Sequence, residues 1–385
     1  MIIDLPGTSL DLLSKLSVVI PSIDHPNLLE RSIEYWRSLP IQVHILDGSH
    51  QPNFKETDFS GLQIKYHHLP WSEDNDRYSN FCNRMRLGTK LTDSKYSVIC
   101  GDDDFFTVSG MLKAIATLEA KPQIDAVTGR TVYYKEGLEF KRWSMKGLSR
   151  TFSPLMESES LETRLLLSNA PWIMYAICRT GLWRQLFDIS FSNRIDNSGA
   201  HELLVRELSP MMFRSTLIDD VLSVRQVTIP GSNPPDPVAL SSWIQIQIAK
   251  DNCRVLREKI ISALNFCAPN YSESQIDSTV DQVLKKYVEP DSDSKIDSKS
   301  HPSIVARARK ALIKATPENL KYLASFILQP RSVLQGRRSS LRVFLYNLRR
   351  SGIGFEGYEL TRISEIVSNP DFEFTIRAKI SHNKS

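Results

Sequence analysis

The chain has 385 residues, of which 41% are hydrophobic and 24% are charged, and its formal net charge at pH 7 is +4. The five cysteines show no CxxC spacing, which excludes a zinc-finger pattern and a disulfide framework and favours a reducing compartment. There is no basic and apolar leader at the start, and no run near the roughly 18 apolar residues of a membrane span, so we expect a cytoplasmic protein.

The first 135 residues alternate predicted strands and helices. A β-branched strand over residues 15–21 is followed by a helix from Pro26 to about residue 39 and by a second strand over 41–46, which ends in the turn Asp47-Gly48-Ser49. Strand–helix–strand in about 30 residues predicts a βαβ unit with parallel strands. The segments that continue this alternation are a strand at 62–67, a helix at 76–91, a strand from residue 96, a helix at 111–120 capped by Ser109, and strands at 124–128 and 131–134.

The strand that begins at Tyr96 runs into three consecutive carboxylates, Asp102, Asp103 and Asp104. Ligands of open α/β sheets bind at the carboxyl ends of the strands, and three acids at such a place repel one another unless a positive charge lies between them. A divalent cation that also holds substrate phosphates would supply that charge. A solvated acidic turn is the alternative, and the buried strand before it and the pair Phe105-Phe106 after it favour the metal site.

The pattern after residue 135 is mixed and then becomes helical. We predict helices near 160–168, 181–187 and 198–208 and strands at 172–178 and 221–227. The breaker cluster at 231–237 predicts a boundary between a domain of residues 1–230 and a helical C-terminal domain of residues 231–385. That second domain has predicted helices at 239–268, 273–288, 303–315, 317–328, 338–351 and 356–368 and a low-complexity, flexible loop near 290–302.

Residues 304–350 contain eleven Lys or Arg against one acid, Glu318. Basic amphipathic helices of this kind bind anionic membrane surfaces or lipid-linked molecules, and they are also found as solvated faces of helical bundles. Nucleic acid is the partner that we favour least. Peripheral contact with the inner face of a membrane therefore stays open.

Three blocks, in this order, resemble the GT-A glycosyltransferases, in particular the family 2-like bacterial enzymes of cell-surface polysaccharide biosynthesis. Residues 16–22 are similar to the first strand of that family, residues 43–49 to its second strand with an Asp-Gly-Ser turn, and residues 96–106 to the strand that ends in its DxD metal motif. The helix with Asn83, Arg84 and Gly88 is similar to the helix that borders the nucleotide. The resemblance covers residues 15–135 well and extends more weakly to about 230.

The resemblance implies a GT-A fold, which is a Rossmann-like, mostly parallel α/β sheet flanked by helices, and a metal-dependent, inverting transfer of a sugar from a nucleotide-diphosphate donor to a glycan or lipid-linked acceptor. Mg²⁺ or Mn²⁺ would stabilise the leaving diphosphate. In this reading Asp102 and Asp104 hold the ion, Asp102 also lies near the ribose, and Asp103 points toward the donor sugar as a catalytic residue. The remaining residues implied to bind the nucleotide sugar are Pro21, Ser22, Asp24, Asp47, Asn83 and Arg84.

An inverting transfer needs a base for the acceptor hydroxyl. The family places an acid downstream, at the start of a helix, and Glu202 after His201 is the best match, although the chain departs there from the commoner Glu-Asp pair. An ordinary surface acid is the alternative for Glu202, and Glu207, Asp219 and Asp220 are weaker candidates. A nucleotidylyltransferase and a non-catalytic nucleotide-binding relative are the other functions considered; the first lacks the glycine-rich basic loop that a triphosphate needs.

Overall fold

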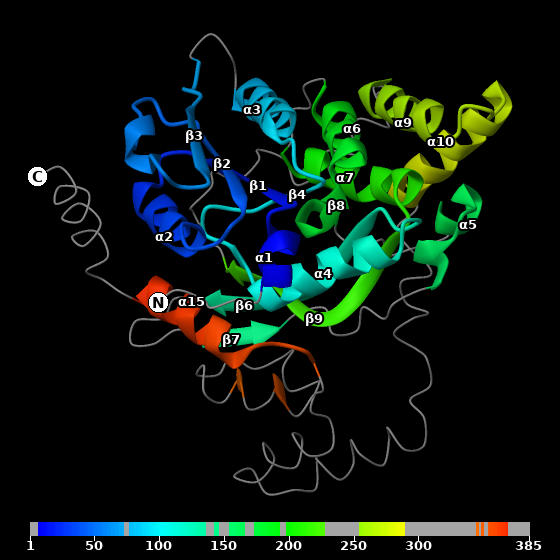
Figure 1. Ribbon diagram of the computed structural model, residues 1–385. Coiled ribbons are helices and arrows are strands. Elements are labelled where there is room, and N and C mark those ends of the chain that lie inside the picture. Colours follow the sequence, from blue (N-terminus) through cyan, green and yellow to red (C-terminus); the bar gives the residue numbers. More distant parts are fainter. Residues whose placement is uncertain are drawn as a thin grey trace, which may run out of the picture.

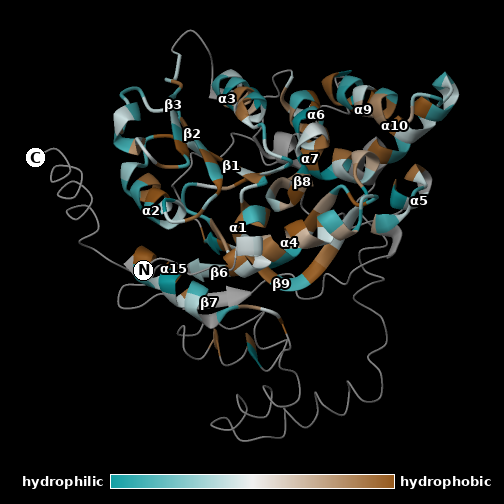
Figure 2. Ribbon diagram, viewed as in Figure 1, coloured by the Kyte–Doolittle hydropathy of each residue, from teal (hydrophilic) through white to brown (hydrophobic). Residues whose placement is uncertain are grey.

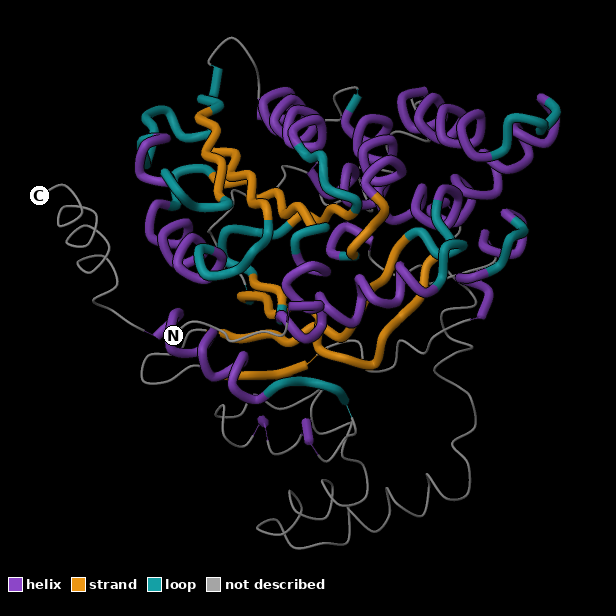
Figure 3. Tube along the Cα trace, in the orientation of Figure 1, coloured by secondary structure: helices purple, strands orange, loops and turns teal. Residues whose placement is uncertain are grey.

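The computed structural model describes residues 7–72, 77–135, 142–145, 154–165, 173–192, 198–227, 254–288, 344–345, 348–349 and 353–368. A mixed sheet runs through the centre of this part of the chain, between helices (Figure 3). The strand order is β3 (Ile64–His68), β2 (Gln42–Asp47), β1 (Leu16–Ser22), β4 (Tyr96–Ile99), β8 (Ile177–Arg179), β6 (Ala126–Lys135), β9 (Ser215–Gln226) and β5 (Phe105–Phe106), while β7 (Arg142–Met145) pairs with β6.

The first four strands of this order are parallel to one another, as the βαβ pattern predicted. Strand β8 is antiparallel to both β4 and β6, and β5 is antiparallel to β9, whereas β6 and β9 are parallel. The predicted α/β class is therefore confirmed, with the parallel pairing concentrated in the N-terminal half.

The helices cover both faces of the sheet (Figure 1). One face packs against α1 (Gly7–Leu13), α2 (Pro26–Trp36), α4 (Val108–Ala120) and α15 (Gly357–Ser368). The other face packs against α3 (Arg77–Leu91), α5 (Leu161–Leu165), α6 (Thr180–Phe191), α7 (Ser198–Met212), α9 (Arg254–Cys267) and α10 (Glu273–Val288). Short 3₁₀ turns lie at Glu56–Phe59, Pro154–Glu157 and Ile173–Tyr175.

Strand β1 explains why both faces are covered. Val18 and Ile20 belong to the first hydrophobic cluster, and Val19 between them belongs to the second. A parallel strand that is buried on both faces reads as a continuous apolar run rather than as an alternation, which is the pattern of residues 18–20. The helices show the complementary pattern, with hydrophobic and hydrophilic sides visible on α3 and α6 in Figure 2.

The start of α4 differs from the prediction. The N-cap is Thr107, whose hydroxyl accepts a hydrogen bond from the Gly110 N–H, and not Ser109. Strand β5 ends at Phe106 and leaves Thr107 in an extended conformation, which is the backbone geometry of an N-cap. Ser109 lies inside the helix, where its hydroxyl and N–H donate to Glu359 of α15.

Three predicted strands also differ. The strand predicted at 172–178 is a 3₁₀ turn followed by the short β8, and the two strands predicted at 124–128 and 131–134 are one irregular strand, β6. Its pairing with β9 shifts register around Gly129, where a Cβ would lie 2.5 Å from the Cβ of Leu222. This irregularity interrupts the alternation on which the prediction depended. Strand β9 is longer than predicted because its first half pairs with the start of β6.

The described helices after residue 231 lie at opposite ends of the molecule (Figure 1): α9 packs against α6, α7 and α10, and α15 contacts α2 and α4. Lys259 of α9 is buried and donates to the carbonyls of Ile189 and Ser190 at the end of α6. The predicted boundary at 231–237, the loop near 290–302 and the basic helices of 304–350, except for four residues, lie outside the described residues. The division at residue 230 therefore stays a prediction.

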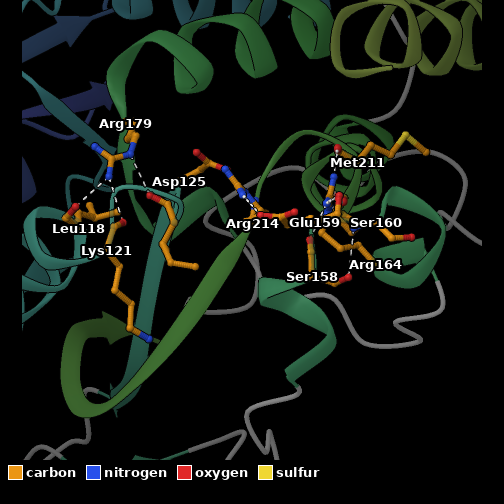
Figure 4. A network of polar contacts seen from close by, with 12 residues as sticks. Leu118, Lys121, Asp125, Ser158, Glu159, Ser160, Arg164, Arg179, Met211 and Arg214 are labelled. Carbon is orange, nitrogen blue, oxygen red and sulfur yellow. Dashed lines mark hydrogen bonds and ion pairs between the residues drawn. The ribbon is translucent and has the colours of Figure 1, made fainter. Parts of the chain in front are cut away.

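Where β6 and β9 begin, arginine side chains donate hydrogen bonds to backbone carbonyls of loops and helix ends (Figure 4). Arg179 donates to the carbonyls of Leu118 and Lys121 at the end of α4, and Arg164 donates to those of Ser158 and Met211. Such donors satisfy carbonyls that the last turn of a helix leaves without intrahelical partners. Within the described part of the chain, no helix is both long and apolar enough to cross a membrane.

Candidate functional site

Side chains from three elements meet where β1 and β4 end. The chain leaves β1 toward α2 and β2 on one side, and it returns through α3 to β4 on the other side, so β1 and β4 flank a topological switch point. The Ser22 hydroxyl donates to Oδ2 of Asp102 at 2.7 Å, and Nδ1 of His25 lies 3.2 Å from the same oxygen. Ligands of open α/β sheets bind at such a point.

His25 precedes α2 and places its imidazole at this site. Its hydrogen bond to Asp102 raises the pKa of His25 above its usual 6.5, against the opposing effect of burial. The side chain is 36% exposed, whereas that of Asp102 is 12% exposed. Asp102 thus meets an imidazole and a hydroxyl at one oxygen, and no described residue donates to its other oxygen.

The three acids form a tight turn after β4. The Asp104 N–H donates to the Gly101 carbonyl, and the Cys100 thiol donates to the Asp104 carbonyl. A Cβ on residue 101 would lie 3.0 Å from Asp103 Oδ1 and 3.0 Å from Asp104 Oδ2, so both carboxylates fold back over Gly101. Both carboxylates thus lie close to residue 101, where glycine leaves them room.

Asp103 lies half-buried in this turn. Burial, followed by the charges of Asp104 and Asp102, raises its pKa to about 7. The Tyr134 hydroxyl donates to its backbone carbonyl at 3.1 Å. A carboxylate with such a pKa lacks sufficient positive charge around it, which is the electrostatic situation that a bound cation relieves.

Asp104 has a different environment from the other two acids. It is 2% exposed, its Oδ2 accepts from Nε of Arg225 at 3.0 Å, and its Oδ1 accepts from the N–H of Gln226 at 3.2 Å. Burial raises the pKa of Asp104, and the Arg225 guanidinium opposes that rise. Both oxygens of this carboxylate are therefore occupied by groups from β9.

A divalent cation fits part of this acidic turn. Its ligands would be hard oxygens, which the carboxylates of Asp102 and Asp103 provide. Among the described residues no group of three or more His, Cys, Asp or Glu side chains is arranged as a metal site. A cation here would thus depend on oxygens of a bound phosphate as well, as Mg²⁺ commonly does. Of the two predicted metal ligands, Asp102 suits this role, and Asp104 would first have to leave Arg225.

Asp47 ends β2 and organises the neighbouring loop. Its carboxylate accepts hydrogen bonds from the Ser49 N–H, from both the backbone and the side chain of Asn53, and from the Tyr66 hydroxyl. Burial raises the pKa of Asp47, but the hydrogen bonds from Ser49 and Tyr66 outweigh it and lower the pKa below the usual 3.8. The residue is fully buried. Its predicted contact with a nucleobase stays a prediction, and a base would add a fifth donor.

Arg84 connects the ends of β1 and β2. Its guanidinium donates to the Ser22 carbonyl at 3.3 Å and lies directly over Gly48, where a Cβ would be 2.0 Å from Cζ. Burial lowers its pKa, and the charges of Asp47 and Asp24 oppose this. Arg84 is 8% exposed, and its Nε has no hydrogen-bond partner among the described residues. A buried guanidinium with an unused donor at the strand ends suits an anionic ligand.

The other predicted site residues lie less close to the three acids after β4. Pro21 pairs with Leu46 within the sheet, and Asp24 has a positive φ of 54° and donates its N–H to Ser49. Asn83 is exposed on α3 and makes no described contact with the acids. Glu202 lies in α7, but its side chain is outside the described residues.

The weaker candidates for the base have partners of their own. Glu207 pairs with Arg206, Asp219 with Arg130, and Asp220 with Lys113. None of these three acids has a described contact with Asp102, Asp103 or Asp104.

Sequence reasoning missed His25, Arg225 and Tyr134 as members of the site. His25 stands directly before the predicted helix, in the loop that follows the first strand. This position in the sequence was a signal that its side chain could reach the strand ends. Arg225 is 121 residues from Asp104 along the chain, and the alternation of residues 221–227 gave no indication of its partner.

No family model matches the sequence, and no curated protein matches it. Solved structures show similarity in the path of the chain. The structure of S. aureus TarS 1–349 with UDP-GlcNAc is 14% identical, with a TM-score of 0.43, and the match covers 89% of this chain and 93% of that chain. The same fragment with UDP is 13% identical, with a TM-score of 0.41 over the same shares. The match to a longer TarS structure covers 83% of this chain and 53% of that one, with 14% identity and a TM-score of 0.41.

Proposed function

We propose that the chain is a GT-A glycosyltransferase of the family 2-like type, which moves a sugar from a nucleotide-diphosphate donor to a glycan or lipid-linked acceptor with inversion. The observation that carries this proposal is the meeting of Ser22, His25 and Asp102 at the ends of β1 and β4. An α/β sheet binds its ligand at such a switch point. The neighbouring Asp103, whose pKa is raised to about 7, indicates a need for added positive charge there.

The roles of the residues follow from their surroundings. Asp102, supported at one oxygen by Ser22 and His25, would present its other oxygen to the cation and the ribose. Mg²⁺ or Mn²⁺, when bound, would stabilise the charge of the diphosphate as it leaves. Arg84 would offer its unused N–H to a phosphate or to the base, from beneath the loop that Asp47 organises. Pro21, Asp24 and Asn83 would line the pocket, and Asp103 would face the donor sugar.

The acceptor side of the reaction is a further part of the proposal. Glu202, near the start of α7, would take the proton of the acceptor hydroxyl. The basic segment 304–350 would hold a lipid-linked acceptor at the inner face of a membrane by attraction to anionic headgroups. Flotation with vesicles of phosphatidylcholine and phosphatidylglycerol tests this contact, which should disappear when only phosphatidylcholine is used.

Calorimetric titration of the full chain with UDP, GDP and dTDP, each with and without Mn²⁺, tests the donor proposal. We expect one nucleotide to bind at least about tenfold more tightly with Mn²⁺, because Asp102 and Asp103 would hold the ion and the ion would supply positive charge for the diphosphate. Incubation with a panel of sugar nucleotides that includes UDP-GlcNAc should then show slow hydrolysis of the matching donor.

Two outcomes would replace this proposal. Binding of no nucleotide, with or without Mn²⁺, would favour a non-catalytic relative. Release of pyrophosphate from a nucleoside triphosphate and a sugar 1-phosphate would favour a nucleotidylyltransferase.

A further inference from the structure

Of the three acids at the end of β4, Asp102 meets Ser22 and His25 of the site, and Asp104 is bound to β9. Asp104 is 2% exposed, and each of its oxygens accepts a hydrogen bond, from Nε of Arg225 at 3.0 Å and from the N–H of Gln226 at 3.2 Å. A charge-assisted pair in such a buried place is costly to separate, because each partner would be left as an uncompensated charge.

Arg225 is itself held on its other side. Its Nη2 donates to the Tyr175 hydroxyl at 2.9 Å, and its guanidinium carbon lies 4.0 Å from the centroid of the Tyr175 ring. This stacking and the two hydrogen bonds fix the plane of the guanidinium. Arg225 is therefore placed to hold Asp104 rather than to follow a ligand.

The same strand end also holds the backbone of the acidic turn. The Tyr134 hydroxyl lies between the Asp103 carbonyl at 3.1 Å and Oε1 of Gln226 at 2.9 Å. Nη2 of Arg31 from α2 donates to that same Oε1 at 3.2 Å. Strand β9 thus contacts the turn through the side chain of Asp104 and, by way of Tyr134, through the carbonyl of Asp103.

We propose that Arg225 is a positioning residue that withdraws Asp104 from ligand binding, so that Asp102 and Asp103 are the acids that contact the divalent cation and the donor diphosphate. This inference rests on the proposed function, and it revises the role that the DxD resemblance implies for Asp104. Asp104 then serves to hold the turn against β9. Asp102 lies at the switch point beside Ser22 and His25, and Asp103, next to it in the turn, is half-buried.

The test measures metal-dependent nucleotide binding and thermal stability on the same full-length variants. Calorimetry with UDP (or whichever nucleoside diphosphate the wild type binds) and Mn²⁺ gives the affinity, and electron paramagnetic resonance of Mn²⁺ reports on the bound ion directly. The variants are Asp102→Asn, Asp103→Asn, Asp104→Asn, Arg225→Lys and Arg225→Met. The double variant Asp104→Leu with Arg225→Met removes both charges of the pair.

We expect Asp102→Asn and Asp103→Asn to weaken Mn²⁺–nucleotide binding at least about tenfold with little loss of melting temperature. Asp104→Asn should change the affinity less than about threefold but lower the melting temperature by about 5 °C or more, because it breaks a buried ion pair. Arg225→Met should behave like Asp104→Asn, and Arg225→Lys, which keeps the charge but not the planar fork, should fall between Arg225→Met and the wild type.

The double variant keeps the test decisive if Arg225→Met does not fold. Since it leaves no unpaired charge, it should melt above either single variant. The inference is overturned if Asp104→Asn weakens Mn²⁺–nucleotide binding tenfold at an unchanged melting temperature. If the wild type binds no nucleotide, the proposed function fails together with the inference; if it binds and only the variant pattern differs, the inference alone fails.

Discussion

The ends of β2 and β4 both carry acids next to β1, yet the two places differ in the hydrogen-bond donors that surround them. Asp47 at the end of β2 accepts from Ser49, Asn53 and Tyr66 and is fully buried. The turn after β4 holds three carboxylates, and among the described residues the basic side chains in contact with them are His25 at Asp102 and Arg225 at Asp104. The carboxylate of Asp47 stabilises a loop through its hydrogen bonds, whereas the three carboxylates after β4 have too little positive charge around them.

The difference shows that an acid at a strand end does not by itself indicate a ligand. Donors around Asp47 lower its pKa, whereas burial and two neighbouring acids raise the pKa of Asp103 to about 7. A saturated carboxylate stabilises the fold, and an under-compensated one is the better candidate for binding a cation. The four predictions below test this distinction, from the largest expected effect to the smallest.

Asp102→Asn should lower the rate of donor hydrolysis or transfer by about 10² to 10³-fold, because it removes a carboxylate ligand of the cation that would stabilise the negative charge of the leaving group. The rate is measured with the donor identified from the nucleotide panel. Asp188→Asn is the matched control, since Asp188 is a 47% exposed acid paired with Arg86. A loss of less than threefold for Asp102→Asn would remove Asp102 from the site.

Asp47→Ala should lower the free energy of unfolding by about 3 kcal/mol, because it leaves buried donors of Ser49, Asn53 and Tyr66 without an acceptor. Urea denaturation measures this change. Asp11→Ala, at an exposed position of α1, should have little effect. If Asp47→Ala left stability unchanged but abolished nucleotide binding, the contrast between the two strand ends would be wrong.

His44 on β2 makes the stability of that strand depend on pH. Nδ1 of His44 lies 3.3 Å from Nε2 of His67 on β3, and burial, followed by the charge of His67, lowers the pKa of His44 from 6.5 to about 4. The unfolded chain therefore binds more protons between these two values, so stability falls as the pH falls through this window. The free energy of unfolding should drop by about 3 kcal/mol from pH 7 to pH 4 through this residue.

Urea denaturation of His44→Asn across that range checks this expectation. The variant should lose the part of the pH dependence that comes from His44. His50→Asn, at an exposed loop position, should keep the dependence of the wild type. An unchanged pH profile in His44→Asn would show that the imidazole pair does not contribute.

Gly48→Ala should weaken nucleotide binding about tenfold, because the new methyl group would displace the Arg84 guanidinium that lies over residue 48. Calorimetry with the preferred nucleotide and Mn²⁺ measures this effect. Gly181→Ala in α6 is the matched control, since a Cβ there meets no atom within 4 Å. Equal affinities for the two variants would exclude Arg84 from the ligand site.

The elements of the first 135 residues were predictable because their signals are local. Each of these signals depends on residues that are close to one another in the sequence. Examples are the mostly apolar strand of residues 16–20, the amphipathic helix after Pro26 and the turn after Asp47. The strand before Asp102 and the glycine at 101 were predictable for the same reason. The predictions failed at Ser109 and around Gly129, where the length of β5 and the approach of β9 determine the structure.

The residue types at the strand ends could be read along the chain: an acid at the end of β2, three acids after β4 and a serine at the end of β1. Which of these acids have all their hydrogen-bond donors, and which do not, depends on how the strands pack. Asp104 meets Arg225 from 121 residues away, and Asp47 meets Tyr66 across two parallel strands. The physical reason is that periodicity records how a residue is buried within its own element, whereas the charge state and availability of a carboxylate depend on donors that the packing of distant strands brings to it.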